Sequence, residues 1–225
     1  MTLEILSFPI RPDNPSYPGN PATKFEEILS IKRGDLNNTT LLTLYTHNDT
    51  HMDAPRHFNK KGVSVDNINP EKFIYRNVRV VDISPSLGRA IYKRDICNYI
   101  SEDTDLLLIY SGVSQFWETA KEKFIAVENQ PWISADAAEY LINETNVSGI
   151  GVDFMCVDNI KDLTENGSAP VHSLFCGLNS ASRTILIYEN VNVRPVVNEK
   201  VQKVYAIPLM LAGLDGSPLT VIAEL

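Results

Sequence analysis

The sequence predicts an α/β (mixed α+β) fold built on a substantial mixed sheet. Short runs rich in valine, isoleucine, leucine and threonine recur from one end of the chain to the other. Segments with the apolar spacing of a helix lie between several of these runs. Alternation of this kind is typical of a sheet with helices packed against it, and it argues against a helical bundle.

Size and composition favour a single folded unit. The chain has 225 residues, of which 44% are hydrophobic and 21% charged, so it can bury a sizeable core. Single α/β units often exceed the usual domain length of about 100 to 150 residues. Because no repeat or low-complexity tract divides the chain, we expect one domain over residues 1–225.

Strands are expected wherever a short apolar run is bounded by polar or turn-forming residues. The runs rich in β-branched and aliphatic residues predict strands, in chain order, over residues 3–8, 39–46, 78–84, 105–111, 147–154, 184–188, 201–211 and 219–223. The proline-rich segment 12–21 precedes the second of them and is expected to be an ordered arm or loop.

The helix with the best sequence signals covers residues 135–145. Ser134 can cap it, Asp136 lies in its first turn, and an apolar strand begins soon after its end. The pattern therefore predicts a helix that leads directly into a strand. Shorter helices are predicted over residues 93–100, 114–124 and 172–179.

Charge and hydropathy narrow the possible partners and location. The formal charge is −8, from 28 acidic and 20 basic residues, and no basic run is long enough to neutralise a phosphate backbone. We therefore expect no nucleic-acid partner. The chain shows no signal-peptide pattern and no apolar stretch of about 20 residues, so we expect a cytoplasmic protein with no membrane contact.

Cysteine usage agrees with a reducing compartment. Cys97, Cys156 and Cys176 are odd in number and far apart, as expected for reduced thiols and not for a disulfide framework. Cys176 follows His172 by four residues and could act as a nucleophile, although a small buried thiol is the commoner case.

Three of the four histidines lie within one short segment, THNDTHMDAPRHF, which contains His47, His51, Asp53 and His57. The strand over 39–46 would deliver His47 at its end, and Pro55 disfavours a regular helix, so we expect a turn or short helical piece emerging from the sheet. Imidazole and carboxylate ligands suit Zn²⁺, Mn²⁺ or Fe²⁺. The alternative is a set of surface histidines on a polar loop.

The remaining histidine and one downstream carboxylate are weaker candidates. His172 lies in APVHSLFCGL, and Glu189 ends the apolar run RTILIY, where a strand passes into polar sequence. A carboxylate at a strand end often faces a site. Taken alone, however, His172 fits a packing residue and Glu189 a solvated strand end.

Residues 47–58 resemble the H-x-G-T-H-x-D-x-P-x-H-F signature of the cyclase-like metal-dependent hydrolases, which include bacterial kynurenine formamidases and isatin hydrolases. The resemblance extends over most of the chain. Further segments similar to this family follow in the same order: YPGNP, DLLLIYSG, ISADAAEYL, VSGIGVDFMCVDN, PVH, ILIYENV and AIPLMLAGLDGSP.

This resemblance implies a fold, a metal centre and an assembly. The implied fold is a swivelling β/β/α domain, assembled as a homodimer or homotetramer. The implied centre holds one or two divalent ions, Zn²⁺ first and Mn²⁺ as the alternative, since nitrogen and oxygen ligands suit both. The residues matching the family's ligands are His47, His51, Asp53, His172 and Glu189, and His57 matches its candidate general acid/base.

The chain departs from the family pattern in two places. Asp49 replaces the glycine of the signature, which adds a side chain and a charge that could alter the turn or reach the metal or the substrate. The stretch between His172 and Glu189, which contains GLNSASRT, is also longer than expected. The first departure bears on substrate choice and the second on the assignment of Glu189.

The resemblance implies hydrolysis of a small amide, formamide or lactam. A bound metal lowers the pKa of its water towards ~7, from about 15.7 in bulk, and the resulting hydroxide attacks the carbonyl. His57 would relay a proton to the leaving nitrogen. N-formylkynurenine is the reference substrate, which would make the protein an arylformamidase, and isatin or another cyclic amide is the alternative.

Other interpretations stay open at this stage. An aromatic substrate needs an apolar wall, for which Tyr17, Phe58 and Trp132 are candidates, although each singly fits a packing role. The Asp49 departure leaves room for a non-catalytic protein that binds a metal or small ligand. A serine or cysteine hydrolase is disfavoured, because the chain has no G-x-S-x-G motif.

Overall fold

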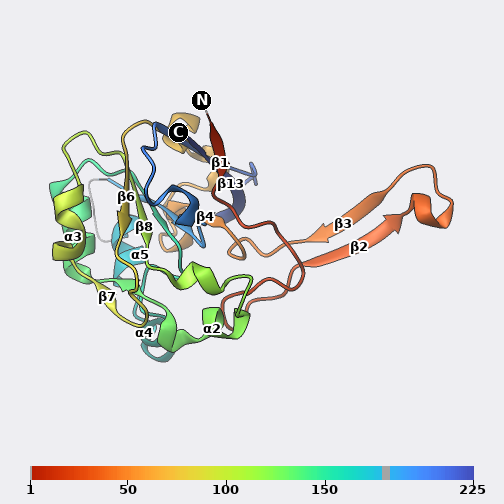
Figure 1. Ribbon diagram of the computed structural model, residues 1–225, viewed down its shortest axis with the longest axis horizontal. Coiled ribbons are helices and arrows are strands. Elements are labelled where there is room, and N and C mark those ends of the chain that lie inside the picture. Colours follow the sequence, from red (N-terminus) through yellow and green to blue (C-terminus); the bar gives the residue numbers. More distant parts are fainter. Residues whose placement is uncertain (1, 179–182) are drawn as a thin grey trace.

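The computed structural model describes residues 2–178 and 183–225 and is organised around one mixed sheet (Figure 1). The strand order is β5-β12-β13-β4-β11-β10-β8-β6, with β1 paired to β13 as well. The α/β class with a substantial mixed sheet is therefore confirmed. The strands of this sheet are β1 (Leu3–Ile5), β4 (His51–Asp53), β5 (Ile74–Tyr75), β6 (Val78–Asp82), β8 (Leu106–Tyr110), β10 (Gly149–Val152), β11 (Leu186–Glu189), β12 (Lys203–Pro208) and β13 (Gly216–Glu224).

The sheet has a parallel half and an antiparallel half. Strands β6, β8, β10 and β11 run parallel, whereas β4, β13, β12 and β5 pair antiparallel. The two halves join at β4, which is only three residues long and lies between β11 and β13. Residues on β4 are therefore flanked by strands from the C-terminal part of the chain.

Strands β8, β10 and β11 are buried on both faces, which explains their apolar runs, whereas β6 at the edge is only partly buried. Along β8, Leu107 and Ile109 belong to one core, and Leu106 and Leu108 belong to another. Successive side chains of a strand point to opposite faces, so β8 contributes side chains to both cores.

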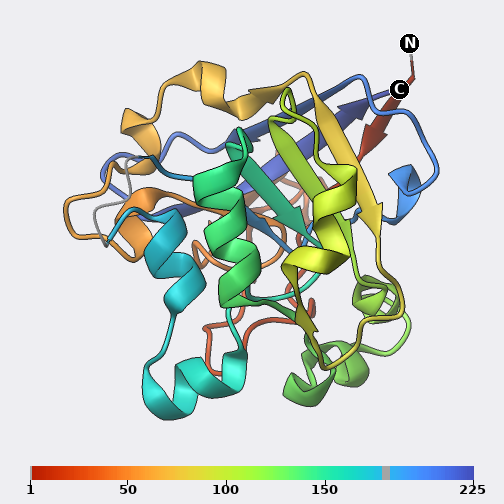
Figure 2. The same ribbon diagram turned by 90° about the vertical axis from the view of Figure 1, so that its left-hand side faces the viewer.

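Helices cover one face of the sheet (Figure 2). The central one, α3, contacts α1 and α5 and buries Ala137, Ala138, Leu141 and Ile142 in the first core.

None of the described helices combines the length and apolar character needed to cross a membrane. The helices are α1 (Lys93–Ile96), α2 (Lys121–Ile125), α3 (Ala135–Glu144), α4 (Ile160–Asn166) and α5 (Pro170–Phe175), and a two-stranded sheet of β7 (Ala90–Ile91) and β9 (Trp132–Ile133) lies apart from the main sheet. Short 3₁₀ turns cover Ile31–Arg33, Pro55–His57, Val65–Asn67, Pro70–Phe73, Cys97–Tyr99, Val113–Phe116, Val127–Asn129 and Arg194–Val196.

The predicted helices are present, with different bounds. The helix expected over 93–100 is α1 continued by a 3₁₀ turn, and that expected over 114–124 is a 3₁₀ turn followed by α2. The helix expected over 172–179 is α5, which begins earlier at Pro170; the expected end at Asn179 lies outside the described residues. Ser134 precedes α3 as predicted, but its hydroxyl bonds Ile91 O and Asp136 and not the helix backbone.

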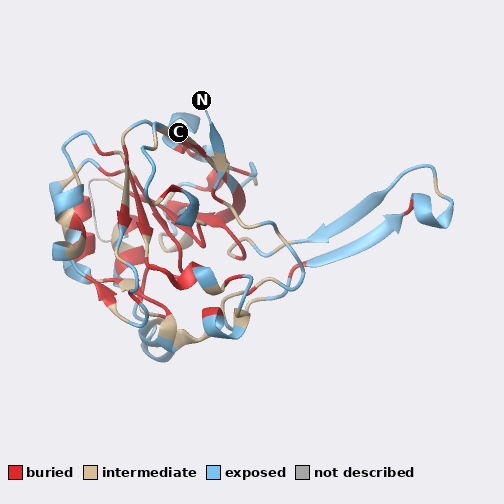
Figure 3. Ribbon diagram, in the orientation of Figure 1, coloured by how far each residue is buried: buried red, intermediate tan, exposed pale blue. Residues whose placement is uncertain are grey.

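The N-terminal part contains a separate hairpin, which the sequence did not predict. Strands β2 (Lys24–Leu29) and β3 (Thr39–Thr43) pair with each other and extend away from the main sheet (Figure 1). Every residue of both strands is exposed (Figure 3). The expected strand over 39–46 therefore ends at Thr43 and does not carry His47 out of the main sheet. Adjacent apolar residues such as Leu41 and Leu42 point to opposite faces of this ribbon, so its apolar run does not indicate burial.

Candidate metal centre

Strand β4 carries two of the expected ligands on one face. His51 and Asp53 are two residues apart, so their side chains point the same way, and both are 2% exposed. The expectation of a turn or short helical piece is correct for His47, in a turn, and for His57, in a 3₁₀ turn, but wrong for His51 and Asp53. Pairing with β11 and β13 imposes the extended conformation, and a 3₁₀ turn begins only afterwards, at Pro55.

The residue that replaces the signature's glycine has the backbone conformation that glycine favours. Asp49 has φ 56°, in the left-handed region. Its carboxylate accepts a hydrogen bond of 2.5 Å from Asn14 Nδ2 and so is held by the N-terminal segment, while its backbone carbonyl lies 3.0 Å from His51 Nδ1. That carbonyl accepts the Nδ1 proton, which leaves the His51 Nε2 lone pair facing the cluster.

His47 lies between two carboxylates. Its Nδ1 is 2.7 Å from Asp53 Oδ1, and its Nε2 is 3.0 Å from Asp215 Oδ2. The ring packs against the backbone of Gly216, where an added Cβ would lie 2.8 Å from His47 Nε2 and 2.9 Å from Met52 O. Only a glycine at the start of β13 leaves room for this imidazole.

His172 reaches the cluster from α5. Its Nδ1 lies 2.7 Å from Asp158 Oδ2, and Asp158 also accepts the backbone N–H groups of Val171 and His172. The other ring nitrogen, Nε2, is 3.3 Å from Asp53 Oδ2 and 3.5 Å from Glu189 Oε1. Asp158 therefore fixes both the ring orientation and the nitrogen that faces the cluster.

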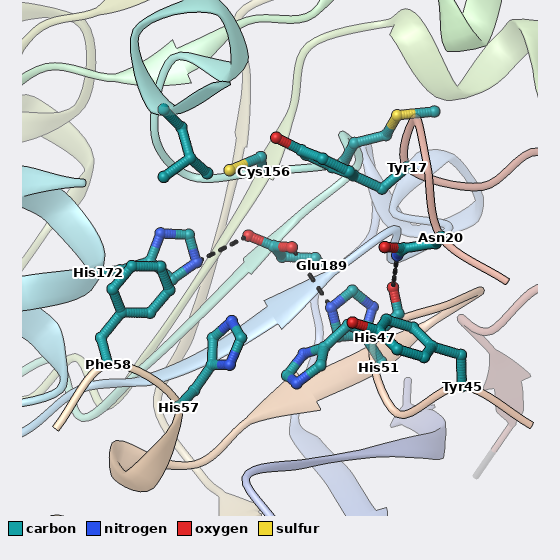
Figure 4. A pocket seen from close by; sticks show the side chains of 12 residues that line it. Tyr17, Asn20, Tyr45, His47, His51, His57, Phe58, Cys156, His172 and Glu189 are labelled. Carbon is teal, nitrogen blue, oxygen red and sulfur yellow. Dashed lines mark hydrogen bonds and ion pairs between the residues drawn. The ribbon is translucent and has the colours of Figure 1, made fainter. Parts of the chain in front are cut away.

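Glu189 completes the group from the end of β11, where it pairs in register with His51. It is 4% exposed, so it is not a solvated strand end. Its Oε1 accepts a hydrogen bond of 2.8 Å from Val157 N, and its Oε2 lies 3.4 Å from His51 Nε2 (Figure 4). The longer stretch between His172 and Glu189 has not moved this carboxylate away from the cluster.

His57 lies at the edge of the same group. It follows Pro55 in the 3₁₀ turn, and its ring stacks on that of His47 at 3.9 Å between centroids. Its Nδ1 lies 3.1 Å from Asp215 Oδ2. Its side chain is 26% exposed, in contrast to the buried His51 and His172. It is therefore the histidine of the group that is most open to solvent.

Charges in the cluster set one another's protonation. Burial alone would raise the pKa of Asp53, but the neighbouring His47 charge, the His47 hydrogen bond to Oδ1 and the nearby His172 imidazole outweigh it and hold this pKa well below its usual value. Burial opposes protonation of His47, yet the Asp53 and Asp215 carboxylates raise its pKa to about 10. The pKa of Glu189 is also lowered, because the neighbouring imidazoles of His172 and His51 outweigh burial and the Asp53 charge. Both inner carboxylates are thus ionised at neutral pH.

These donors fit a divalent cation. Asp53 Oδ2 is buried and accepts no hydrogen bond from a described residue, although His172 Nε2 lies 3.3 Å from it. A buried carboxylate oxygen left in this state is costly, and a cation would satisfy it. Two overlapping sets of donor atoms each lie within 4.8 Å of one another: His47, His51 and Asp53, and Asp53, His57 and His172. Asp53 belongs to both sets, so its carboxylate lies at the centre of the donor group.

A cavity of about 200 Å³ opens onto the cluster (Figure 4). Two of the three aromatic residues considered from the sequence, Tyr17 and Phe58, line it, and Tyr45 does so as well. Trp132 instead lines a separate cavity beside Gln130. Phe58 also stacks on His172, at 4.4 Å between ring centroids. The cavity therefore presents aromatic walls beside the histidines.

Sequence reasoning missed two carboxylates, Asp158 and Asp215, that hold the imidazoles. Both lie in segments quoted for the family resemblance, GVDFMCVDN and AGLDGSP. Their local sequence carried no signal of a histidine partner, because those partners lie 14 and 158 residues away along the chain.

Known proteins resemble this chain in family and in fold. The family model described as "Putative cyclase" matches residues 5–159, which include His47, His51, Asp53 and His57. Kynurenine formamidase from Bacillus mycoides is 28% identical over 221 residues, covering 96% of this chain and 94% of that protein. Kynurenine formamidase from Bacillus anthracis is 27% identical with the same coverage.

Solved structures share the fold. Isatin hydrolase A from Ralstonia solanacearum superposes with a TM-score of 0.82 at 22% identity, covering 99% of this chain and 91% of that chain. An isatin hydrolase bound to the product analogue thioisatinate superposes with a TM-score of 0.83 at 17% identity, covering 98% and 91%. Because a family model matches residues 5–159, more than half of its residues, this chain belongs to the cyclase family.

Proposed function

We propose that this protein is a metal-dependent hydrolase that cleaves a small amide, formamide or lactam. The observation that carries the proposal is the convergence of His47, His51, His172 and Glu189, from three separate parts of the chain, on a cavity with aromatic walls, with Asp53 beside these histidines. The proposal treats residues 1–225 as one catalytic domain, because strands from both ends of the chain enter the same sheet.

The proposed ligands are His47, His51, Asp53, His172 and Glu189, with Zn²⁺ as the first choice of ion and Mn²⁺ as the alternative. A divalent ion held there acts as a Lewis acid that activates water and polarises a carbonyl oxygen. Donor sets that overlap at Asp53 support a centre of one or two ions.

His57 is the proposed general acid/base. Asp215 accepts from its Nδ1, which leaves Nε2 free to take a proton from water and pass it to the leaving nitrogen. The ring lines the cavity and keeps some solvent access, as a group that exchanges protons requires. Because Asp215 also contacts His47, one carboxylate positions both the proposed acid/base and a proposed ligand.

An aryl formamide of the N-formylkynurenine type is the leading substrate. The relationship to kynurenine formamidases along 96% of the chain supports a formamide, and the walls formed by Tyr17, Tyr45 and Phe58 support an aryl group. A cyclic amide of the isatin type is the alternative, supported by the shared fold with isatin hydrolases.

A homodimer or homotetramer is the proposed assembly. Support comes from the hairpin of β2 and β3, whose two faces are both exposed and carry apolar side chains such as Phe25, Ile28 and Leu42. A two-stranded hairpin alone in water is marginally stable. We propose that the hairpin packs against a second copy of this chain, in the exposed apolar groove beside Ile5 and Leu209.

The proposed function is tested by metal analysis followed by turnover assays. The purified protein is loaded with Zn²⁺ or Mn²⁺ and assayed with formylated anilines, lactams and imides, with and without a chelator. We expect turnover that the chelator abolishes. Metal binding without turnover of any of these amides would instead support a non-catalytic binding protein, and absence of metal binding would overturn the proposal.

A further inference from the structure

Cys156 is held rigidly at the wall of the proposed metal centre. It follows β10 and is 3% exposed. The residues on either side of it are fixed by their backbone N–H groups: Met155 N donates to Gln130 Oε1 at 3.0 Å, and Val157 N donates to Glu189 Oε1 at 2.8 Å. The second bond ties the Cys156 backbone directly to a proposed metal ligand.

The thiol of Cys156 lies with two proposed ligands. Its Sγ, one ring nitrogen of His172 and one carboxylate oxygen of Glu189 all lie within 4.8 Å of one another, and the three residues line the same cavity (Figure 4). Donors that share one tetrahedral Zn²⁺ at about 2.0 to 2.3 Å lie roughly 3 to 4 Å apart. A small side-chain movement therefore suffices for all three to reach one ion.

Resting on the metal centre proposed above, we propose that Cys156 is a further donor to the cation bound by His172 and Glu189. The sulfur binds as a thiolate, and its proton passes to solvent. Because thiolate favours thiophilic ions, this donor selects Zn²⁺, Co²⁺ or Cd²⁺ over Mn²⁺, which prefers oxygen ligands. The choice of metal, which the nitrogen and oxygen ligands leave open, thus depends on one side chain.

Cys176 provides a matched control. It is equally buried, at 2% exposed, and lies in the same part of the fold, but its Sγ donates to Ala54 O at 3.9 Å. It belongs to none of the donor groups found among the described residues. Replacing it removes a buried thiol without removing the proposed donor.

The test is absorption spectroscopy of the Co²⁺-loaded protein. Visible ligand-field bands report a bound ion, and a near-ultraviolet sulfur-to-cobalt charge-transfer band reports a thiolate ligand. We expect both in the wild type and in Cys176→Ser, and loss of the near-ultraviolet band alone in Cys156→Ser. We also expect Cys156→Ser to weaken Zn²⁺ binding by about tenfold or more, with a change in Mn²⁺ binding below about threefold.

The outcomes separate this inference from the proposed function. Visible bands without the charge-transfer band in the wild type would overturn the role of Cys156 and leave the metal centre standing. No bound ion at all would overturn the proposed function. If Cys156→Ser fails to fold, X-ray absorption of the Zn²⁺-loaded wild type decides, since a zinc–sulfur distance of about 2.3 Å is expected and its absence refutes the proposal.

Discussion

In each of two histidines, a carboxylate binds one ring nitrogen, so the other ring nitrogen faces the cavity. Asp158 binds Nδ1 of His172, and Asp215 binds Nδ1 of His57. A carboxylate in this position fixes the tautomer and raises the basicity of the opposite nitrogen. The same device thus serves a proposed metal ligand in one case and a proposed proton carrier in the other.

The Asp158–His172 pair predicts a loss of metal affinity on mutation. Asp158→Asn keeps the size of the side chain but removes the charge, so we expect divalent-ion affinity to fall about 10- to 100-fold. Competition with a chromophoric chelator measures this. Asp162→Asn, an exposed change on α4 close in sequence, is the control and should bind as the wild type does. Equal affinity in all three proteins would contradict the assigned role of Asp158.

The proposed acid/base predicts a loss in turnover. His57→Ala should lower kcat on the best amide substrate by about 10²-fold or more, because proton transfer to the leaving nitrogen is lost. Because the ring also stacks on His47, metal content must be measured alongside and should stay at the wild-type level. An unchanged kcat in the metal-replete variant would rule out this function for His57.

The left-handed backbone of Asp49 predicts a difference between two substitutions. Both Asp49→Gly and Asp49→Ala remove the bond from Asn14, so they differ only in a Cβ held at φ 56°. We expect the glycine variant to be more stable than the alanine variant by about 1 kcal/mol, since the strain of the left-handed region exceeds the entropy that glycine gains on unfolding. Urea denaturation measures it. A higher unfolding free energy for Asp49→Ala than for Asp49→Gly would show that alanine adopts this left-handed conformation with little strain.

The sequence predicted that the candidate ligands lie close together, but it did not predict the carboxylates that bind their imidazole rings. His47, His51, Asp53 and His57 fall within one short segment, so their proximity could be predicted from the pattern itself. Asp215 binds His57 across 158 residues of chain. No local pattern encodes such a pair, because it depends on β13 lying beside β4 in the folded sheet.

Strands that are buried on both faces could be predicted from their apolar sequences. A strand that is extended only because it pairs with neighbouring strands could not. Strands β8 and β11 have apolar runs because each contributes side chains to two cores, and β10 contributes Ile150 and Val152 to one of them. Strand β4 reads His-Met-Asp, with one apolar residue in three, and it is extended because it pairs on both sides. Its two polar residues, His51 and Asp53, are proposed metal ligands, and strand pairing, not apolar sequence, makes this segment extended.

The end of α3 depends on a side chain from a distant loop. Arg183 donates from Nη2 to Leu141 O at 2.7 Å and to Val147 O at 2.9 Å, and from Nε to Ile142 O at 2.9 Å. Carbonyls in the last turn of a helix lack partners within the helix, and a cation there also favours the helix dipole. The stretch that lengthens the chain before β11 therefore ends on a residue that caps the central helix.

This contact predicts a loss of stability. Arg183→Ala should lower the free energy of unfolding by about 1 to 3 kcal/mol, because buried or half-buried carbonyls lose charged donors. Arg183→Lys should recover only part of it, since one ammonium cannot reproduce the planar fork of donors. Chemical denaturation of the three proteins measures both effects. Equal midpoints and slopes would show that water replaces the guanidinium without cost.

At the scale of the whole molecule, the exposed hairpin predicts self-association. Phe25 and Leu42 are cross-strand partners on one face of the ribbon. Replacing both with glutamate should convert the proposed homo-oligomer to a monomer, because two charges would have to be buried at the interface. Light scattering after size exclusion gives the mass. Lys32→Glu, in the turn of the hairpin, is the matched charge change, and equal masses for all three proteins would refute this interface.

The central position of β4 has a consequence for the order of events during synthesis. Its two neighbours are residues 186–189 and 216–224, so the strand that carries His51 and Asp53 has no partner until nearly the whole polypeptide has emerged. Contacts so remote in sequence form late and slowly. A ribosome-bound chain that ends before Asp215 would hold all four histidines and β11, yet lack β13 and the carboxylate that binds His47 and His57. We therefore expect the proposed ion to load as a finishing step of maturation.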